Sequence, residues 1–225
     1  IYRGIKKTIQ MKNLEKRKEV IKYSIKLNTT NLSPLRSGNI SVRSTENSVE
    51  GFLITPSGKK YDTLKEEDIV FVSNDGNHDT NLKPSSEWRF HKDIYLKKPD
   101  AKAIVHAHSP HATAVSAHGK DIPAFHYMIA LAGGDSIKCA KYATFGTQEL
   151  SNNILDALEN RKACLMSNHG QVAFGENIES AFELAEELEN ICHQYINTIK
   201  LGEPKILSSS EMDVILEKVK NYKKG

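Results

Sequence analysis

Cysteine is scarce in this chain and gives no sign of a disulfide or metal framework. The three cysteines, Cys139, Cys164 and Cys192, are odd in number and widely spaced, and no CxxC pair occurs. A disulfide scaffold or a cysteine-based metal site would need paired thiols at short spacings. We therefore expect small buried thiols in a reduced, cytoplasmic protein.

Long apolar runs and a basic excess are also missing. No segment approaches the roughly 20 apolar residues that a membrane-spanning helix needs, and we expect no secretion signal. The formal net charge of +3 comes from Arg3, Lys6 and Lys7, because without them the basic residues fall from 31 to 28 and equal the 28 acidic residues. We therefore expect neither a membrane nor a nucleic acid as a partner.

The rest of the composition is that of one ordinary globular domain. The chain has 225 residues, and a single core serves chains of up to about 250 residues. Met11 directly follows the basic first ten residues and opens a helical pattern. We therefore predict that residues 1–10 are an added or upstream extension, or else a disordered arm, and that residues 11–225 form the domain.

Helix and strand patterns are mixed along the chain. Apolar residues at helical spacing predict helices over 12–29, 85–97, 146–161 and 178–201. Pro110 is predicted to open a further helix, and the capping-box pattern Ser208–Glu211 predicts a last one. Short β-branched or alternating runs predict strands over 37–44, 51–58, 68–73, 103–108, 163–170 and 171–175. Ser85 or Ser86 is the predicted N-cap of the second helix. The expected fold is a single α/β domain whose helices cover a mainly antiparallel central sheet.

The stretch VHAHSPHA brings three histidines together, at positions 106, 108 and 111. Side chains at i and i+2 of a strand share a face, so His106 and His108 project together at a strand end. A zinc site open to substrate needs a third protein ligand, and His169, at another strand end before a glycine, is the best candidate. An isolated HxH is more often a pair of surface or core histidines without a ligand, but Glu87 at the start of a helix favours a metal site.

Two further histidines have weaker contexts. His111 begins the helix after Pro110, off the face of the strand, and we interpret it as structural or as a support for the site. His91 lies four residues after Glu87, so it either pairs with Glu87 or lies on the helix surface.

Three short segments are suited to bind an anion. They are Gly38-Asn39, Ser57-Gly58 and Ser85-Ser86, and they offer backbone N–H groups and small hydroxyls in turns and at a helix start. Such groups bind phosphate without a lysine. Each segment alone is a weak signal, but beside a three-histidine site they indicate a phosphorylated substrate that chelates a metal.

Seven motifs then occur in an order that resembles the class II aldolase/adducin family. They are GNISVR, LITPSG, PSSEWRFH, VHAHSPHATAVS, IPAFHYMIALAGGDSI, YATFGTQEL and NHGQVAFG. The resemblance covers about residues 11–222 and implies the three-layer fold of that family. It implies Zn²⁺ held by His106, His108 and His169, with Glu87 as the fourth ligand at rest and as the catalytic acid/base. The phosphate ligands that it implies are Gly38, Asn39, Ser57, Gly58, Ser85 and Ser86.

The resemblance also implies a site shared between subunits of a homotetramer. Tyr127 would be the proton donor that reaches a neighbouring subunit, and Phe145 and Tyr222 would line the aldehyde side. One departure is Leu35-Arg36-Ser37, where family members usually carry small residues, often Gly-Thr. This chain therefore lacks a threonine there, and Arg36 either contacts the phosphate or points to solvent.

The activity that the resemblance implies is reversible aldol cleavage of L-fuculose 1-phosphate, or a similar ketose 1-phosphate, to dihydroxyacetone phosphate and L-lactaldehyde. The main alternative is 4-epimerisation of L-ribulose 5-phosphate within the same family, with a methylthioribulose-phosphate dehydratase further off. Such epimerases usually carry an acidic His-Ala-Asp-Tyr-like segment where this chain has His126-Tyr127-Met128-Ile129. A non-catalytic adducin-like module is a remote third, because such modules tend to lose the histidines.

Overall fold

The computed structural model describes residues 11–79 and 81–222, and its centre is one seven-stranded sheet. The strand order is β3-β2-β1-β4-β7-β6-β5, and every neighbouring pair is antiparallel except β5 and β6. The strands are β1 (Asn39–Glu46), β2 (Val49–Ile54), β3 (Val70–Ser73), β4 (Ala103–Ala107), β5 (Cys139–Ala140), β6 (Ala163–Met166) and β7 (Gly170–Gly175). The prediction of a mainly antiparallel α/β domain is confirmed.

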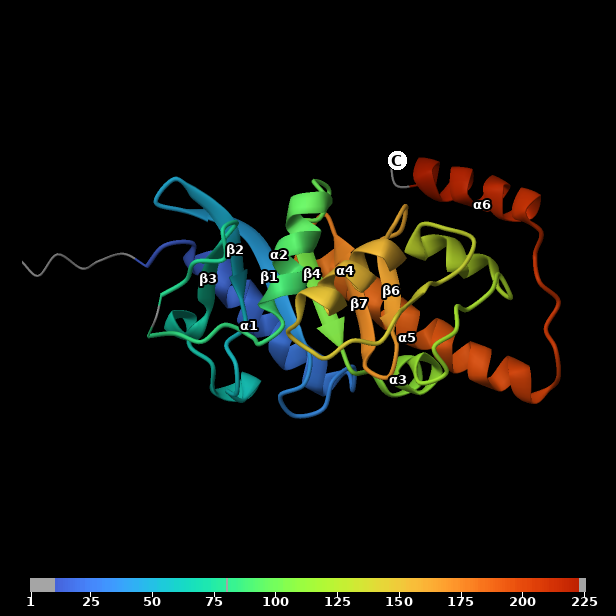
Figure 1. Cartoon of the computed structure of the whole chain (residues 1–225), viewed down its shortest axis with the longest axis horizontal. Coiled ribbons are helices and arrows are strands. Elements are labelled where there is room, and N and C mark those ends of the chain that lie inside the picture. Colours follow the sequence, from blue (N-terminus) through green and yellow to red (C-terminus); the bar gives the residue numbers. More distant parts are fainter. Residues whose placement is uncertain (1–10, 80, 223–225) are drawn as a thin grey trace, which may run out of the picture.

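Helices cover both faces of this sheet (Figure 1). They are α1 (Leu14–Thr29), α2 (Trp88–Lys97), α3 (Pro110–Ser116), α4 (Gln148–Ala157), α5 (Ile178–Lys200) and α6 (Ser209–Tyr222). Strand residues alternate between two apolar clusters, so that Val105 of β4 packs with residues of α1, α3 and α5 and Ile104 packs with residues of α2 and α4. Burial on both faces explains why β4 shows no alternation of apolar and polar residues and is apolar except at His106.

The C-terminal helix α6 lies at one end of the molecule, beside the short 3-10 helix η3 (Tyr127–Ala132) (Figure 1). Its Met212 is fully buried in the cluster that α5 also joins. The predicted capping box is present, because Ser208 Oγ accepts from the Glu211 N–H and Glu211 Oε2 accepts from the Ser208 N–H at 2.7 Å. Two more 3-10 helices, η1 (Tyr61–Thr63) and η2 (Glu66–Asp68), connect β2 to β3.

Local details differ from the predictions at α2 and at β5. Glu87 occupies the N-cap position of α2 without a side-chain capping hydrogen bond, and the prediction of Ser85 or Ser86 as the N-cap is wrong. The reason is that Ser85 is tied to the strand layer, since its N–H donates to the Thr55 carbonyl at 2.9 Å, and the chain turns before the helix begins. Strand β5 has two residues and was not predicted, because so short a pairing leaves no periodic pattern.

The described residues contain no helix that is both long and apolar enough to cross a membrane. Residues 1–10, for which we predicted an extension or a disordered arm, lie outside the described part of the chain. The domain bounds therefore stay a prediction at that end.

Candidate metal centre and phosphate pocket

Four predicted ligands meet at one point of the structure. Glu87, His106, His108 and His169 each offer one donor atom, and these atoms all lie within 4.8 Å of one another. His106 Nε2 lies 3.0 Å from His108 Nε2 and 3.1 Å from Glu87 Oε2, and His169 Nε2 lies 3.2 Å from Glu87 Oε1. The strand-face argument that grouped His106 with His108, and added His169 from a second strand end, thus describes a real cluster.

The sheet explains why residues far apart in the sequence meet here. His106 lies on β4, His108 just beyond its end, and His169 in the turn between β6 and β7. A Cβ at Gly170 would collide with the carbonyl oxygen of Ala107. Glycine at this position therefore lets the turn that carries His169 lie against the end of β4.

The donor set fits a zinc-like divalent cation. His106 Nδ1 lies 2.8 Å from the Gln171 carbonyl, and a carbonyl only accepts, so this nitrogen donates and Nε2 keeps its lone pair for the cluster. Glu87 Oε1 is buried and lies against Nε2 of the cluster residue His169 at 3.2 Å, with no further hydrogen-bond donor among the described residues. Three imidazole nitrogens and a carboxylate are the ligands that zinc prefers in catalytic sites, so these residues could hold the ion.

The charges of the four groups depend on one another. Burial raises the pKa of Glu87, but the neighbouring His106 and His169 outweigh burial and hold that pKa well below its ordinary value. Burial lowers the pKa of His106, and the Glu87 carboxylate more than offsets this effect. Burial, together with His106 and His169, lowers the pKa of His108 to about 3. The ionised Glu87 carboxylate and the neutral His108 ring are thus in the forms that bind a cation, whereas the raised pKa of His106 means that a cation must displace a proton more readily held than in free imidazole.

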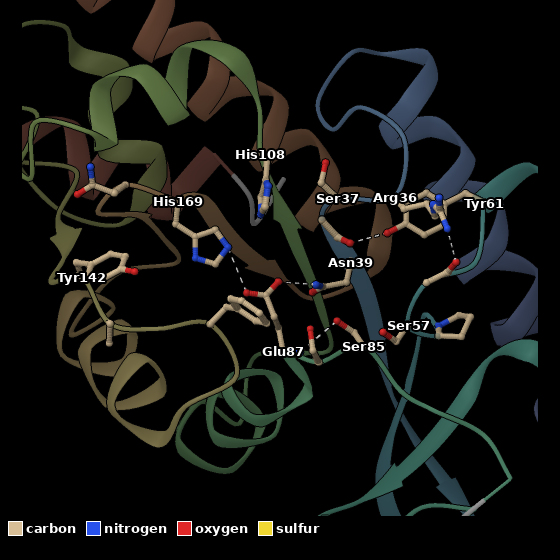
Figure 2. A pocket seen from close by; sticks show the side chains of 17 residues that line it. Arg36, Ser37, Asn39, Ser57, Tyr61, Ser85, Glu87, His108, Tyr142 and His169 are labelled. Carbon is tan, nitrogen blue, oxygen red and sulfur yellow. Dashed lines mark hydrogen bonds and ion pairs between the residues drawn. The ribbon is translucent and has the colours of Figure 1, made fainter.

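A cavity of about 380 Å³ opens directly beside this cluster (Figure 2). Its lining includes three of the cluster residues and all six residues predicted to bind phosphate. The lining residues predicted from the sequence are Gly38, Asn39, Ser57, Gly58, Ser85, Ser86, Glu87, His108, Phe145 and His169. The predicted metal and phosphate groups therefore share one pocket.

Arg36 is the one lysine or arginine among the residues that line the cavity. Its Nη1 donates to the Gly58 carbonyl at 2.8 Å, which joins the loop before β1 to the loop after β2 (Figure 2). Gly58 has a φ of +77° and open space where a side chain would project. The side chain of Arg36 therefore lies at the end of the pocket that holds the predicted phosphate segments.

The residues expected on the aldehyde side are more dispersed. Phe145 lines the cavity and is 64% exposed. Tyr127 begins η3, is 55% exposed and is not among the lining residues. The side chain of Tyr222, at the end of α6, lies outside the described part of the structure. Tyr142 lines the pocket too and was not predicted, because the motif YATFGTQEL singled out only its phenylalanine.

Two histidine predictions are resolved by the structure. The helix-surface interpretation of His91 is wrong, because His91 is fully buried and contacts Asn39 and Ser41 instead of pairing with Glu87. His111 is structural, as one of the interpretations held: its Nδ1 lies 2.7 Å from Glu189 Oε1, away from the metal-ligand cluster.

Comparison with known proteins places this fold and site in one family. Residues 18–196 match the family model of the class II aldolase and adducin N-terminal domain, and the chain belongs to that family. Its activity class is that of a class II aldolase, a lyase that acts on carbon–carbon bonds.

Similar proteins include two kinds of sugar-phosphate aldolase. The 5-methylthioribulose-1-phosphate/5-deoxyribulose-1-phosphate aldolase of Rhodospirillum rubrum is 47% identical over 194 residues, which is 86% of each chain. The L-fuculose phosphate aldolase of Escherichia coli K12 is 46% identical over 206 residues, 91% of this chain and 94% of the relative. A solved L-fuculose 1-phosphate aldolase superposes with a TM-score of 0.86 at 40% identity, covering 92% of this chain and 96% of the other.

Proposed function

We propose that this protein reversibly cleaves L-fuculose 1-phosphate to dihydroxyacetone phosphate and L-lactaldehyde. The observation that carries the proposal is the shared pocket, in which three histidines and a glutamate adjoin three phosphate-binding segments. A 5-deoxypentulose 1-phosphate is the second candidate substrate, because the relative at 47% identity bears that name. Cleavage between C3 and C4 leaves dihydroxyacetone phosphate from either sugar, so the two candidates differ only in the aldehyde.

In this proposal the cluster residues hold Zn²⁺. The ion would act as a Lewis acid on the substrate carbonyl and stabilise the negative charge that develops as the bond breaks. Glu87 delivers a proton to C3 in cleavage and removes it in condensation. Its Oε1 lies 3.2 Å from His169 Nε2 and has no other donor among the described residues, so a move from the cluster to the substrate would break contacts only with cluster residues at that oxygen.

The phosphate end is proposed to use backbone N–H groups and small hydroxyls. Its members are Gly38, Asn39, Ser57, Gly58, Ser85 and Ser86, with Arg36 as an added cationic contact. Arg36 would take the place of the threonine that family members usually carry in this loop. A guanidinium presents several donors in a fixed fork that suits phosphate oxygens.

We further propose a homotetramer in which Tyr127 serves the site of a neighbouring subunit. The support is its position: the hydroxyl-bearing side chain is exposed on η3 and outside the pocket of its own chain. Phe145, and Tyr222 of α6, would complete the aldehyde side. Tyr127 would take the C4 hydroxyl proton in cleavage and return it in condensation.

Mixing inactive variants tests the shared site. Glu87→Gln and Tyr127→Phe subunits, each inactive alone, should regain activity when dissociated and reassembled together, because some sites then combine an intact Glu87 with an intact Tyr127. Tyr142→Phe is the matched control inside the pocket. No regain in the mixture, with activity abolished in Tyr142→Phe, would assign the proton step to Tyr142.

The substrate is tested by condensing dihydroxyacetone phosphate with a panel of aldehydes. L-Lactaldehyde, acetaldehyde and methylthioacetaldehyde separate the fuculose, deoxyribulose and methylthioribulose activities. Dihydroxyacetone paired with glycolaldehyde phosphate tests the epimerase alternative. We expect the highest kcat/KM with L-lactaldehyde, and a higher value with acetaldehyde would transfer the assignment to the deoxypentulose phosphate.

The role of Glu87 is tested by isotope exchange. Glu87→Gln should retain a bound cation but lose exchange of the C3 proton of dihydroxyacetone phosphate with solvent. Exchange at the wild-type rate in this variant would remove Glu87 from the proton step.

A further inference from the structure

A buried row of polar side chains joins the cluster residue Glu87 to the interior of the α2–β1 layer. Glu87, His91 and Tyr95 lie four residues apart along one face of α2, and Asn39 and Ser41 lie two apart on β1. All five are at most 7% exposed. Four residues of helix rise about 6 Å and two residues of strand about 6.6 Å, so the two rows can interlock in register.

The contacts alternate between helix and strand along the whole row. Asn39 Nδ2 donates to Glu87 Oε2 at 2.9 Å, and Asn39 Oδ1 lies 2.5 Å from His91 Nε2. His91 Nδ1 lies 2.7 Å from Ser41 Oγ, which in turn lies 2.8 Å from the Tyr95 hydroxyl. We call these five residues the polar ladder.

The chemistry of each group gives the polar ladder one direction. A carboxylate only accepts, so the NH₂ of Asn39 must face Glu87 and its carbonyl oxygen must face His91. His91 Nε2 therefore carries the proton, and Nδ1 accepts from Ser41. Ser41 Oγ then accepts from the Tyr95 hydroxyl. Burial lowers the pKa of His91 to about 3, which agrees with a neutral ring that has one donor and one acceptor.

We propose that His91 is a positioning residue that fixes the amide of Asn39 and thereby the carboxylate of Glu87. An inverted amide would place the Asn39 oxygen against the Glu87 carboxylate, where two acceptors repel. In the tautomer that the carboxylate selects, His91 opposes this inversion, because an inverted amide would place the Asn39 NH₂ against the His91 Nε2–H and would require the ring to change tautomer. The ladder holds Asn39 in the same orientation whether Glu87 lies at the cluster or at the substrate.

The proposal rests on the proposed role of Glu87, and a matched pair of amide variants tests it. Glutamine extends its terminal nitrogen about as far as histidine Nε2, whereas asparagine reaches only as far as Nδ1. His91→Gln keeps a donor to Asn39, and His91→Asn loses it, although both are neutral amides. We expect C3 proton exchange to fall about 10- to 100-fold in His91→Asn, the range typical of groups that orient a metal ligand, and to recover in His91→Gln.

Two further measurements separate positioning from simple packing. When Asn39 is already replaced by alanine, the His91→Asn substitution should have no further effect on the rate of C3 proton exchange. The visible spectrum of bound Co²⁺, which reports the arrangement of its ligands, should shift in His91→Asn and return in His91→Gln. Equal losses in both variants, or an effect that persists without the Asn39 amide, would overturn the proposal.

The Co²⁺ spectrum also separates this proposal from the proposed function. If the wild type neither cleaves nor exchanges, the proposed function fails, and the spectrum still shows whether His91 orients the carboxylate. If the wild type exchanges and His91→Asn matches it in both rate and spectrum, the ladder proposal alone fails.

Discussion

Replacing Gly38 with alanine should lower both the stability and the affinity for a cation, because Gly38 lies where the predicted phosphate loop meets the cluster of predicted metal ligands. Its φ is +80°, and an added Cβ would lie 2.6 Å from the His106 carbonyl oxygen and 2.6 Å from Ser33 Oγ. Ser33 Oγ accepts the backbone N–H of His108 at 2.8 Å. The methyl group would therefore push on the backbone of one predicted ligand and on the support of another.

Gly58 provides a matched control for the size of this effect. Its φ of +77° is nearly the same, but an added Cβ would meet nothing within 4 Å. A left-handed backbone costs an alanine about 1–2 kcal/mol, and overpacking adds about 1–3 kcal/mol. Gly58→Ala should therefore lose about 1–2 kcal/mol, and Gly38→Ala about 2–5 kcal/mol.

Equilibrium urea unfolding measures the free energy of unfolding of both variants, and titration with Zn²⁺ measures the affinity of the cluster for the cation. We expect Gly38→Ala to bind Zn²⁺ more weakly than the wild type and Gly58→Ala to bind it equally well. Equal destabilisation of the two variants, with equal affinity for Zn²⁺, would refute the reasoning from the close contact.

Three other predictions concern the cation, the phosphate and the acid limit of stability. Chelation with EDTA should abolish aldol cleavage and added Zn²⁺ should restore it, whereas full activity after chelation would end the metal mechanism. Arg36→Ala should raise KM for dihydroxyacetone phosphate about tenfold, as expected for one charge-assisted phosphate contact, with kcat little changed. The KM of the variant should also depend less on salt concentration than that of the wild type. An unchanged KM would place Arg36 in solvent. Burial raises the pKa of Glu189, but its hydrogen bonds with Ser109, His111 and Ala112 outweigh burial and hold the pKa below 4.5. A pKa that is lower in the folded than in the unfolded chain stabilises the fold at pH values above the unfolded pKa. The free energy of unfolding should therefore be about 1–2 kcal/mol higher for the wild type than for Glu189→Gln at pH 7, and this difference should shrink as pH falls below about 4.5. A difference that stays constant with pH would contradict this role of Glu189.

Strand geometry made much of the site predictable from the sequence. The two-residue period of a strand was enough to group His106 with His108, and the strand end before Gly170 singled out His169. Residues typical of turns and of a helix start predicted the phosphate segments. These arguments need only local periodicity and a resemblance of ordered motifs. They hold because each predicted ligand lies at or beside the end of a regular element.

The polar ladder could not be predicted in the same way. Its two rows are 48 to 54 residues apart in the sequence, and only the packing of α2 on β1 brings them into register. His91 alone resembles any histidine on a helix, since its burial depends on that packing. The N-cap of α2 was missed for a related reason, because the pairing of Ser85 with Thr55 is tertiary.

The wide separation of the cluster residues along the chain means that a bound cation would link the end of β4, the β6–β7 turn and the start of α2. An unfolded chain can offer only the neighbours His106 and His108 together, whereas the native fold adds Glu87 at the start of α2 and His169 in the β6–β7 turn. Free cation at a hundred times its dissociation constant would then stabilise the native state by about 2.7 kcal/mol. Removing the metal would then raise the unfolded fraction about a hundredfold, and with it the fraction of the chain that a protease can cut.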